Sequence, residues 1–262
     1  ALSTDFFVRQ HYLDFLSREP DAQGMSNWQG LLNGCAEPFN SNVSPYDASA
    51  NPSALCDRLN VSANFFLSAE FQLKGGYVFR FYKASLGRLP HYTEFAPDTA
   101  SVTGATAQEV FARKAAFASA WVQRTEFKAL YDAMTNQQFV NALLDRYSLP
   151  SVRTPNPSTP DDSSDANKVT LTRADLVARL DAAAMTRAQV VRAVADSDEV
   201  GGIEFNSAFV SMQYFGYLRR DPDADGYNTW TGFLASHPGQ FRAMVFGFVN
   251  SPEYKSRFGT SH

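Results

Sequence analysis

The sequence lacks a strong excess of one charge, and its lysine and arginine residues do not gather into a basic run. The formal net charge of the 262 residues is −4. Because phosphate binding depends on clustered basic side chains, we expect no nucleic acid among the partners. An uninterrupted apolar run of about 18 residues or more is also missing, which predicts no membrane-spanning helix.

The sequence also lacks the short motifs that carry common enzyme chemistry. It has no G-x-S-x-G, H-E-x-x-H, P-loop or G-x-G-x-x-G pattern. The four histidines are scattered, without metal-ligand spacing. The 27 Asp and Glu residues always allow some carboxylate pair across a groove, but none stands out. We therefore assign no catalytic and no cofactor-binding residue. The sequence favours a protein without catalysis and leaves an enzyme open.

Cysteine is scarce, with Cys35 and Cys56 on either side of a loop rich in Asn, Ser and Pro. A disulfide between them fits best and implies an oxidising, extracellular location. Two unpaired cytosolic thiols are the alternative. A bridge that closes a loop of this size would stabilise the fold by about 3 kcal/mol, by restricting the unfolded chain.

A short motif, in contrast, recurs along the chain. Residues 214–230 hold the strongest copy, and the same skeleton begins at Tyr12 without a gap. A degenerate copy of the motif begins at Tyr82 and has His91 where the other two copies have Asp. The motif residues expected to be structural are Arg18, Asp21, Gly24, Trp28, Arg88, Arg220, Asp223, Gly226 and Trp230.

A second signature, F-x-x-S-x-E-F, marks the end of each unit. It stands at residues 65–71, with counterparts at 121–127 and 248–254 and a fainter match at 194–200. Its glutamates are Glu70, Glu126 and Glu253. The repetition predicts that each motif arginine pairs with the glutamate of its own unit. Such a pair would hold the first turn of a unit to its last helix.

The periodicity of apolar residues predicts helices, and period-2 strands are missing. Pro20 ends the first helix and Asp21 caps the next, while capping boxes open helices at Thr135, Thr172 and Thr186. We expect an all-α protein with about four short helical units, packed into one or two helical subdomains. Each unit is a helix, an R-x-P-D-x-x-G turn, a helix and a long helix.

Other local signals predict breaks and connectors. The glycine pair after residue 74 predicts the end of a long helix over 53–73, and residues 87–106 are expected to form an irregular connector. A helix over 106–133 is expected to break near Arg124. Helical spacing predicts that the three tryptophans, at 28, 121 and 230, are buried.

Composition predicts three regions along the chain. Residues 1–147 form an N-terminal helical region with two motif copies and the disulfide loop. Residues 148–170, rich in Pro, Ser and Asp, form a loop or linker. Residues 171–262 form a C-terminal helical region with the strongest copy.

The pattern Y-x-x-x-L-x-R-x-P-D-x-x-G-x-x-x-W, followed later by F-x-x-S-x-E-F, resembles a bacterial domain family of unknown function. That family is common in large secreted proteins, sometimes beside haemolysin-type calcium repeats, and is similar to the phycobilisome linker domain. Nearly the whole chain resembles a C-terminal module of acidobacterial extracellular proteins. The departures are His91 and the decayed third copy, near Phe139. The resemblance implies a helical fold and an extracellular location.

Calcium is the one metal that the motif suggests. Asp221, Asp223, Asp225 and Gly226 match the opening of an EF-hand loop, in which alternating carboxylates face one hard cation. Gly232 stands where the bidentate Glu should be, and helix capping is the alternative role for these aspartates.

Two functions follow from these patterns. The first is a non-catalytic extracellular module for adhesion, matrix or surface assembly, within a larger secreted bacterial protein and with a protein partner. The alternative is a protein that binds or cleaves an extracellular polysaccharide with a carboxylate pair in a cleft between helices.

Overall fold

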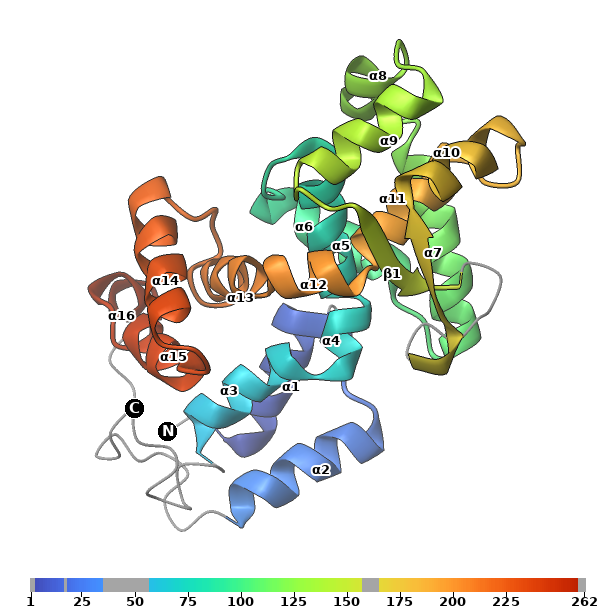
Figure 1. Ribbon diagram of the computed structural model, residues 1–262. Coiled ribbons are helices and arrows are strands. Elements are labelled where there is room, and N and C mark those ends of the chain that lie inside the picture. Colours follow the sequence, from blue (N-terminus) through green and yellow to red (C-terminus); the bar gives the residue numbers. More distant parts are fainter. Residues whose placement is uncertain (1–2, 17, 35–56, 157–164, 259–262) are drawn as a thin grey trace. The chain divides into compact units, whose positions relative to one another are not determined.

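The computed structural model describes residues 3–16, 18–34, 57–156 and 165–258, and these are predominantly helical (Figure 1). The all-α prediction is confirmed. Strand in the described residues is limited to one two-stranded sheet. None of the described helices is both long enough and apolar enough to cross a membrane.

The chain divides into two compact units, each of which contains two copies of the motif unit. Unit 1 consists of Ala1–Gln72 and Asn206–His262, and unit 2 is Leu73–Phe205. The three regions predicted from composition, with a linker over 148–170, stay a prediction.

Unit 1 combines helices from the two ends of the chain, blue to cyan and orange to red in Figure 1. The helix Arg58–Leu67 of the first copy packs on the corresponding helix Phe241–Val249 of the last copy. The elements are α1 (Thr4–Leu16), α2 (Ala22–Asn33), α3 (Arg58–Leu67), α4 (Ala69–Leu73), α13 (Phe205–Gln213), the π-helix η4 (Tyr214–Leu218), α14 (Ala224–Ser236), α15 (Phe241–Val249) and α16 (Pro252–Phe258).

Unit 2 repeats this arrangement with the two middle copies, whose corresponding helices α7 and α11 also pack together. Its elements are α5 (Gly75–Phe81), the π-helix η2 (Tyr82–Leu86), α6 (Tyr92–Val102), α7 (Ala107–Trp121), α8 (Thr125–Tyr131), α9 (Asn136–Asp145), β1 (Ser151–Pro155), the 3-10 turn η3 (Asp165–Asn167), β2 (Lys168–Thr172), α10 (Arg173–Asp181), α11 (Arg187–Ala195) and α12 (Asp198–Ile203).

The capping boxes fix three helix starts, as predicted. The hydroxyls of Thr135, Thr172 and Thr186 each accept a hydrogen bond from the backbone N–H three residues later. Asp21 caps α2 in the same way. These side chains satisfy backbone donors that the first turn of a helix leaves unpaired. The predicted break near Arg124 is also present, between α7 and α8.

Two local predictions are wrong. The connector expected over 87–106 contains α6, because Glu94 accepts a hydrogen bond from the His91 N–H and so caps the helix without the motif aspartate. The helix expected over 53–73 breaks at Ser68, whose hydroxyl donates to the Phe65 carbonyl and accepts from the Phe71 N–H. The predicted helix end at residue 73 is confirmed, since α4 ends at Leu73, and the buried glycine pair at 75–76 begins α5.

The segment between α9 and α10 contains the small sheet. β1 and β2 pair antiparallel, with Ser151 opposite Thr172 and Pro155 opposite Lys168. Val152 and Leu171 point into the core of unit 2 and are buried. The strands are only five residues each, too short for an alternating pattern to be clear in the sequence.

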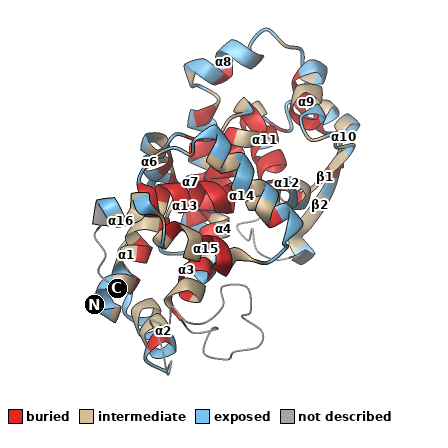
Figure 2. Ribbon diagram, turned by 90° about the vertical axis from the view of Figure 1, so that its left-hand side faces the viewer, coloured by how far each residue is buried: buried red, intermediate tan, exposed pale blue. Residues whose placement is uncertain are grey.

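The tryptophan prediction is correct at one position of three. Trp121 is fully buried, whereas Trp28 and Trp230 are half-buried. The helices α2 and α14 that carry these two residues each bury a single leucine, Leu32 and Leu234, and appear mostly tan and blue in Figure 2. Both helices therefore lie on the surface of unit 1.

Candidate functional site

The recurrent motif forms the same side-chain cluster in three copies. In each copy the arginine guanidinium donates two parallel hydrogen bonds to the glutamate of the ending signature, over distances of 2.6 to 2.8 Å. This two-point geometry is the strongest form of arginine–carboxylate contact. The pairs are Arg18–Glu70, Arg88–Glu126 and Arg220–Glu253.

These pairs are half-exposed and favour the charged forms of both partners. The hydrogen bond to Glu70 raises the pKa of Arg18, and the hydrogen bond from Arg88 lowers the pKa of Glu126. Exposed ion pairs stabilise a fold by about 1 kcal/mol or less. Their main effect is geometric, because each pair joins the end of the first helix of a copy to its last helix.

A tyrosine lies beneath each arginine. The guanidinium of Arg220 is 5.0 Å from the centre of the Tyr214 ring, and Tyr214 meets Phe248 edge to face at 4.9 Å. The first and second copies repeat both contacts, with arginine–ring distances of 4.7 and 5.0 Å. Burial raises the pKa of Tyr214 to about 12. The phenol is therefore neutral at ordinary pH and acts as a packed ring with a polar tip.

A wide turn brings the arginine back over the tyrosine. In the second and last copies the first helix ends in a π-helix, η2 or η4. The Arg220 N–H reaches the Tyr214 carbonyl at 3.5 Å, and the Arg18 N–H reaches the Tyr12 carbonyl at 3.4 Å. The residue that follows the π-helix is left-handed, Gly87 at φ 72° and Arg219 at φ 48°. Sequence reasoning missed this turn, because its only signal is the recurrence of the motif.

The motif glycine makes room for the tyrosine hydroxyl. A Cβ atom on Gly24 would lie 2.1 Å from the Tyr12 hydroxyl, and one on Gly226 would lie 2.1 Å from the Tyr214 hydroxyl. Neither distance is possible without movement. The glycine is therefore required by the tyrosine of its own copy.

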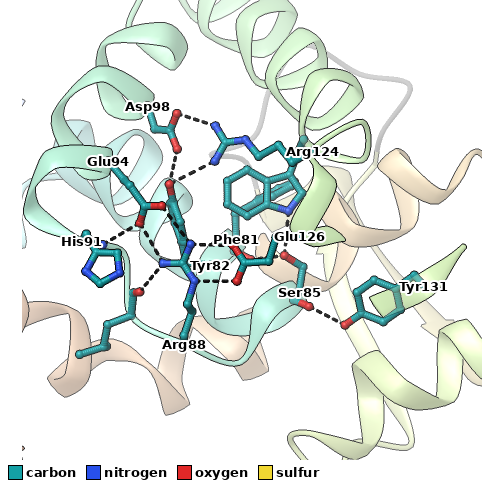
Figure 3. A network of polar contacts seen from close by, with 12 residues as sticks. Phe81, Tyr82, Ser85, Arg88, His91, Glu94, Asp98, Arg124, Glu126 and Tyr131 are labelled. Carbon is teal, nitrogen blue, oxygen red and sulfur yellow. Dashed lines mark hydrogen bonds and ion pairs between the residues drawn. The ribbon is translucent and has the colours of Figure 1, made fainter. Parts of the chain in front are cut away.

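The second copy departs from the pattern at three places, which Figure 3 shows together. His91, Glu94 and Asp98 stand at the positions of the aspartate, glycine and tryptophan of the other copies. Glu94 accepts hydrogen bonds from Arg88 at 2.8 and 3.0 Å and from the His91 N–H at 2.8 Å. Glu94 thus takes over the arginine contact of Asp21 and Asp223, and it bonds the N–H of the cap residue where those aspartates bond the N–H three residues later.

An ion pair replaces the tryptophan of the second copy. Asp98 accepts a hydrogen bond from Arg124 at 2.6 Å and from the Tyr82 hydroxyl at 2.6 Å. In the first copy Trp28 instead stacks on Phe65 at 4.6 Å. Here the Arg124 guanidinium covers the larger ring of Trp121 at 4.1 Å. The Arg124–Asp98 pair and the Trp121 ring thus stand where the first copy has the stacked rings of Trp28 and Phe65.

The decayed copy keeps its glutamate but lacks the motif arginine. Glu199 accepts the Arg153 N–H with both carboxylate oxygens, at 3.2 and 2.9 Å. Ser197 caps α12 as Ser68 caps α4. The ending signature therefore holds β1 in place where the other copies hold an arginine.

The three aspartates of the calcium prediction do not converge. Asp223 caps α14 through the Gly226 N–H at 2.8 Å and accepts a hydrogen bond from Arg220 at 3.2 Å. Within the described residues no group of three or more His, Cys, Asp or Glu side chains is placed to hold a metal ion. Calcium binding at Asp221, Asp223 and Asp225 stays a prediction. The predicted disulfide between Cys35 and Cys56 lies outside the described residues.

These features define a helical repeat protein in which motif units associate in pairs. Residues 204–258, which span α13 to α16 and the strongest motif copy, match the family model described as Domain of unknown function (DUF4214). A comparison with curated proteins and a comparison with solved structures each find no match.

Proposed function

We propose that the chain is a non-catalytic, extracellular helical scaffold that holds protein chains together in adhesion, matrix or surface assembly. It acts as a module of a larger secreted bacterial protein. The observation that carries the proposal is the threefold arginine–glutamate pair. The charged residues that recur most strongly bond each other within the chain. Their recurrence is therefore explained by their structural role.

The partner in this proposal is a protein, and the surface of unit 1 supports that choice. At equivalent positions α2 and α14 bury one leucine each and leave most of their other residues exposed or half-exposed. Stacked helical units offer extended faces of this kind to partners. Asn27 and Thr229 are equivalent exposed positions on the two helices.

Bead aggregation tests the scaffold directly. Beads coated with the full chain should clump, and the double variant Asn27→Glu, Thr229→Glu should clump less, because it adds charge to both faces. Ala129→Glu, at an exposed position of α8, is the matched control and should behave as wild type. Coated beads that stay dispersed would contradict the proposal.

A polysaccharide assay tests the alternative function. The full chain is incubated with soluble xylan, alginate and chitin oligosaccharides, and reducing ends and melting temperature are measured. The scaffold proposal expects neither release of reducing ends nor a thermal shift. Release of reducing ends, or a melting temperature that rises with one polysaccharide, would favour the polysaccharide protein instead.

A further inference from the structure

Unit 1 is assembled from two segments that unit 2 separates along the chain. The segments are Ala1–Gln72 and Asn206–His262. Between them α3 packs on α15, and α1 contacts η4. The corresponding helices α7 and α11 of unit 2 pack in the same way although their copies are neighbours in sequence. Pairing of copies is therefore a property of the helix faces and does not depend on how far apart the copies lie along the chain.

The apolar part of the contact within unit 1 is well matched in shape. Phe66 of the first segment meets Phe209 of the second edge to face, with ring centres 4.8 Å apart, and both rings are fully buried. A Cβ atom on Gly216 would lie 3.0 Å from the Phe15 ring. The Phe15 ring thus fits against the bare backbone of η4.

The polar part adds specificity. Arg242 of α15 pairs with Asp57, the residue that caps α3, and the two side chains are 4% and 2% exposed. Ser62 bonds both His11, at 2.6 Å, and Tyr217 of η4. All three side chains are buried, so this serine–histidine contact belongs to packing and not to a substrate site.

A fifth contact lies at the edge. Arg219 donates to Asp14 at 2.7 Å, with the arginine side chain 44% exposed. Like the other contacts described between the two segments, it is non-covalent. The two ends of the chain thus recognise each other as two binding partners would.

We propose that two copies of this chain associate by exchanging residues 206–258. In the exchanged dimer the second segment of each copy packs on residues 3–72 of the other copy, with the same contacts. Exchange of an identical element is a low-cost route to a dimer, because no new interface has to be formed. This inference identifies the protein partner of the proposed scaffold as a second copy of this chain. Only the use of the dimer in assembly rests on the proposed function, because the exchange itself is argued from the contacts within unit 1.

Chain concentration sets the balance between the closed and exchanged forms. Within one chain the two segments meet at a high effective concentration, so dilute protein is closed and monomeric. Exchange requires unit 1 to open and a second copy to be near. It is therefore favoured when copies are crowded on a surface or refolded together at high concentration.

Reciprocal charge reversal tests the exchange with full-length chains. One variant carries Asp57→Arg and the other carries Arg242→Asp. Alone, each closes with two like charges buried side by side, which is strongly unfavourable. In an exchanged heterodimer the two substituted side chains, now of opposite charge, meet in one copy of unit 1, and the native pair forms in the other.

Co-refolding of the two variants should give a heterodimer that light scattering detects and whose melting temperature exceeds that of either variant. We expect the heterodimer to exceed each homodimer by about tenfold or more. The control carries both changes in one chain, which restores the pair within that chain and should refold as a monomer when dilute. A mixture that stays as two low-melting monomers would overturn the proposal.

A second pair of charge-reversal variants, at a half-exposed contact, tests the exchange if the Asp57 and Arg242 variants do not refold. Asp14→Arg and Arg219→Asp reverse the half-exposed contact, where each variant is expected to keep its fold. Co-refolded at high concentration, they should form a dimer enriched in the heterodimer over the statistical mixture. Absence of any dimer would overturn the exchange.

The two proposals fail separately. Wild-type beads that clump while the variants form no heterodimer would overturn the exchange and leave the scaffold. A heterodimer together with release of reducing ends from a polysaccharide would support the exchange and overturn the scaffold.

Discussion

Arg124 covers the ring of Trp121 at 4.1 Å, and its guanidinium bonds Asp98 at 2.6 Å. These three residues stand where the other copies have a serine, a phenylalanine and a tryptophan. The three side chains act as one cluster, because the guanidinium contacts both the ring and the carboxylate. The second copy therefore keeps the shape of the motif with different chemistry.

Arg124→Ala should lower the free energy of unfolding by about 1–3 kcal/mol, because it uncovers the ring and removes the partner of a largely buried carboxylate. Asp98→Ala should cost less in the Arg124→Ala background than in wild type. Urea unfolding of the four proteins of this double-mutant cycle measures the difference. Additive effects would show that the two side chains act independently.

The pair in the last copy gives a second test. Glu253→Gln and Arg220→Ala should each destabilise the protein, with a coupling of about 1 kcal/mol because both side chains are near one-third exposed. Chemical unfolding of the single and double variants measures it. Unchanged stability in Glu253→Gln, beside a loss in Arg220→Ala, would mean that the arginine acts through its other contacts, which include the Tyr214 ring and Asp223.

Gly226 and Gly232 form a matched pair within α14. Gly226→Ala should destabilise by about 1–3 kcal/mol, since its methyl group meets the Tyr214 hydroxyl, whereas Gly232→Ala faces open space and should be neutral or stabilise by up to about 1 kcal/mol. Thermal unfolding measures both. Adding Tyr214→Phe should recover part of the stability lost in Gly226→Ala. If the double variant is no more stable, the methyl group does not act through the Tyr214 hydroxyl.

His11 should make the fold sensitive to acid. Burial lowers the pKa of His11 to about 4, against the hydrogen bond with the Phe7 carbonyl and together with the charge of Arg58. The folded state therefore holds a neutral imidazole, while the unfolded chain takes up a proton near its usual pKa of about 6.5. The contribution of the neutral His11 ring to the free energy of unfolding is fully present above pH about 6.5. Up to about 3 kcal/mol of it is lost as the pH decreases to about 4.

Two measurements check the histidine. An NMR titration of the His11 ring in folded protein should have its midpoint near 4, and His11→Gln should reduce the loss of stability between pH 6.5 and 4. A midpoint near 6.5 would contradict the burial of a neutral ring. The variant tests whether this group, and not the carboxylates, causes the acid sensitivity.

Melts with calcium and with reductant test the remaining predictions. We expect the melting temperature to be the same with calcium and with a chelator, because Asp223 is already engaged by Arg220 and the Gly226 N–H. A rise that scales with calcium and disappears in Asp225→Asn would establish the metal site. Reductant should lower the melting temperature if Cys35 and Cys56 are bridged, and two thiols that alkylate in unreduced protein would remove this support for an extracellular location.

The sequence predicts best what depends on neighbouring residues. Capping boxes at Thr135, Thr172 and Thr186 locate helix starts because donor and acceptor are three residues apart. Repetition adds the arginine–glutamate pairs, since three copies with the same spacing imply the same contact. The class of fold follows from these two signals.

Contacts between distant segments escape prediction. No sequence pattern within α3 or α15 indicates that the two helices pack together, because the sequence of each helix shows only that one of its faces is apolar. The start of α6 escapes as well, since Glu94 replaces an aspartate three residues earlier and the motif then looks broken. The helix pairing thus depends on a distant partner, and the start of α6 on a local substitution that the repeated pattern does not reveal.

The two-segment construction of unit 1 fixes the order in which the protein can be completed during synthesis. Unit 2 is continuous and can fold as soon as Phe205 has left the ribosome, whereas the helices before Gln72, made first, must wait for α15. Their apolar faces, including Phe66, stay uncovered in the meantime. Residues before Gln72 are thus among the last of these helices to reach their native packing, although they are made before unit 2.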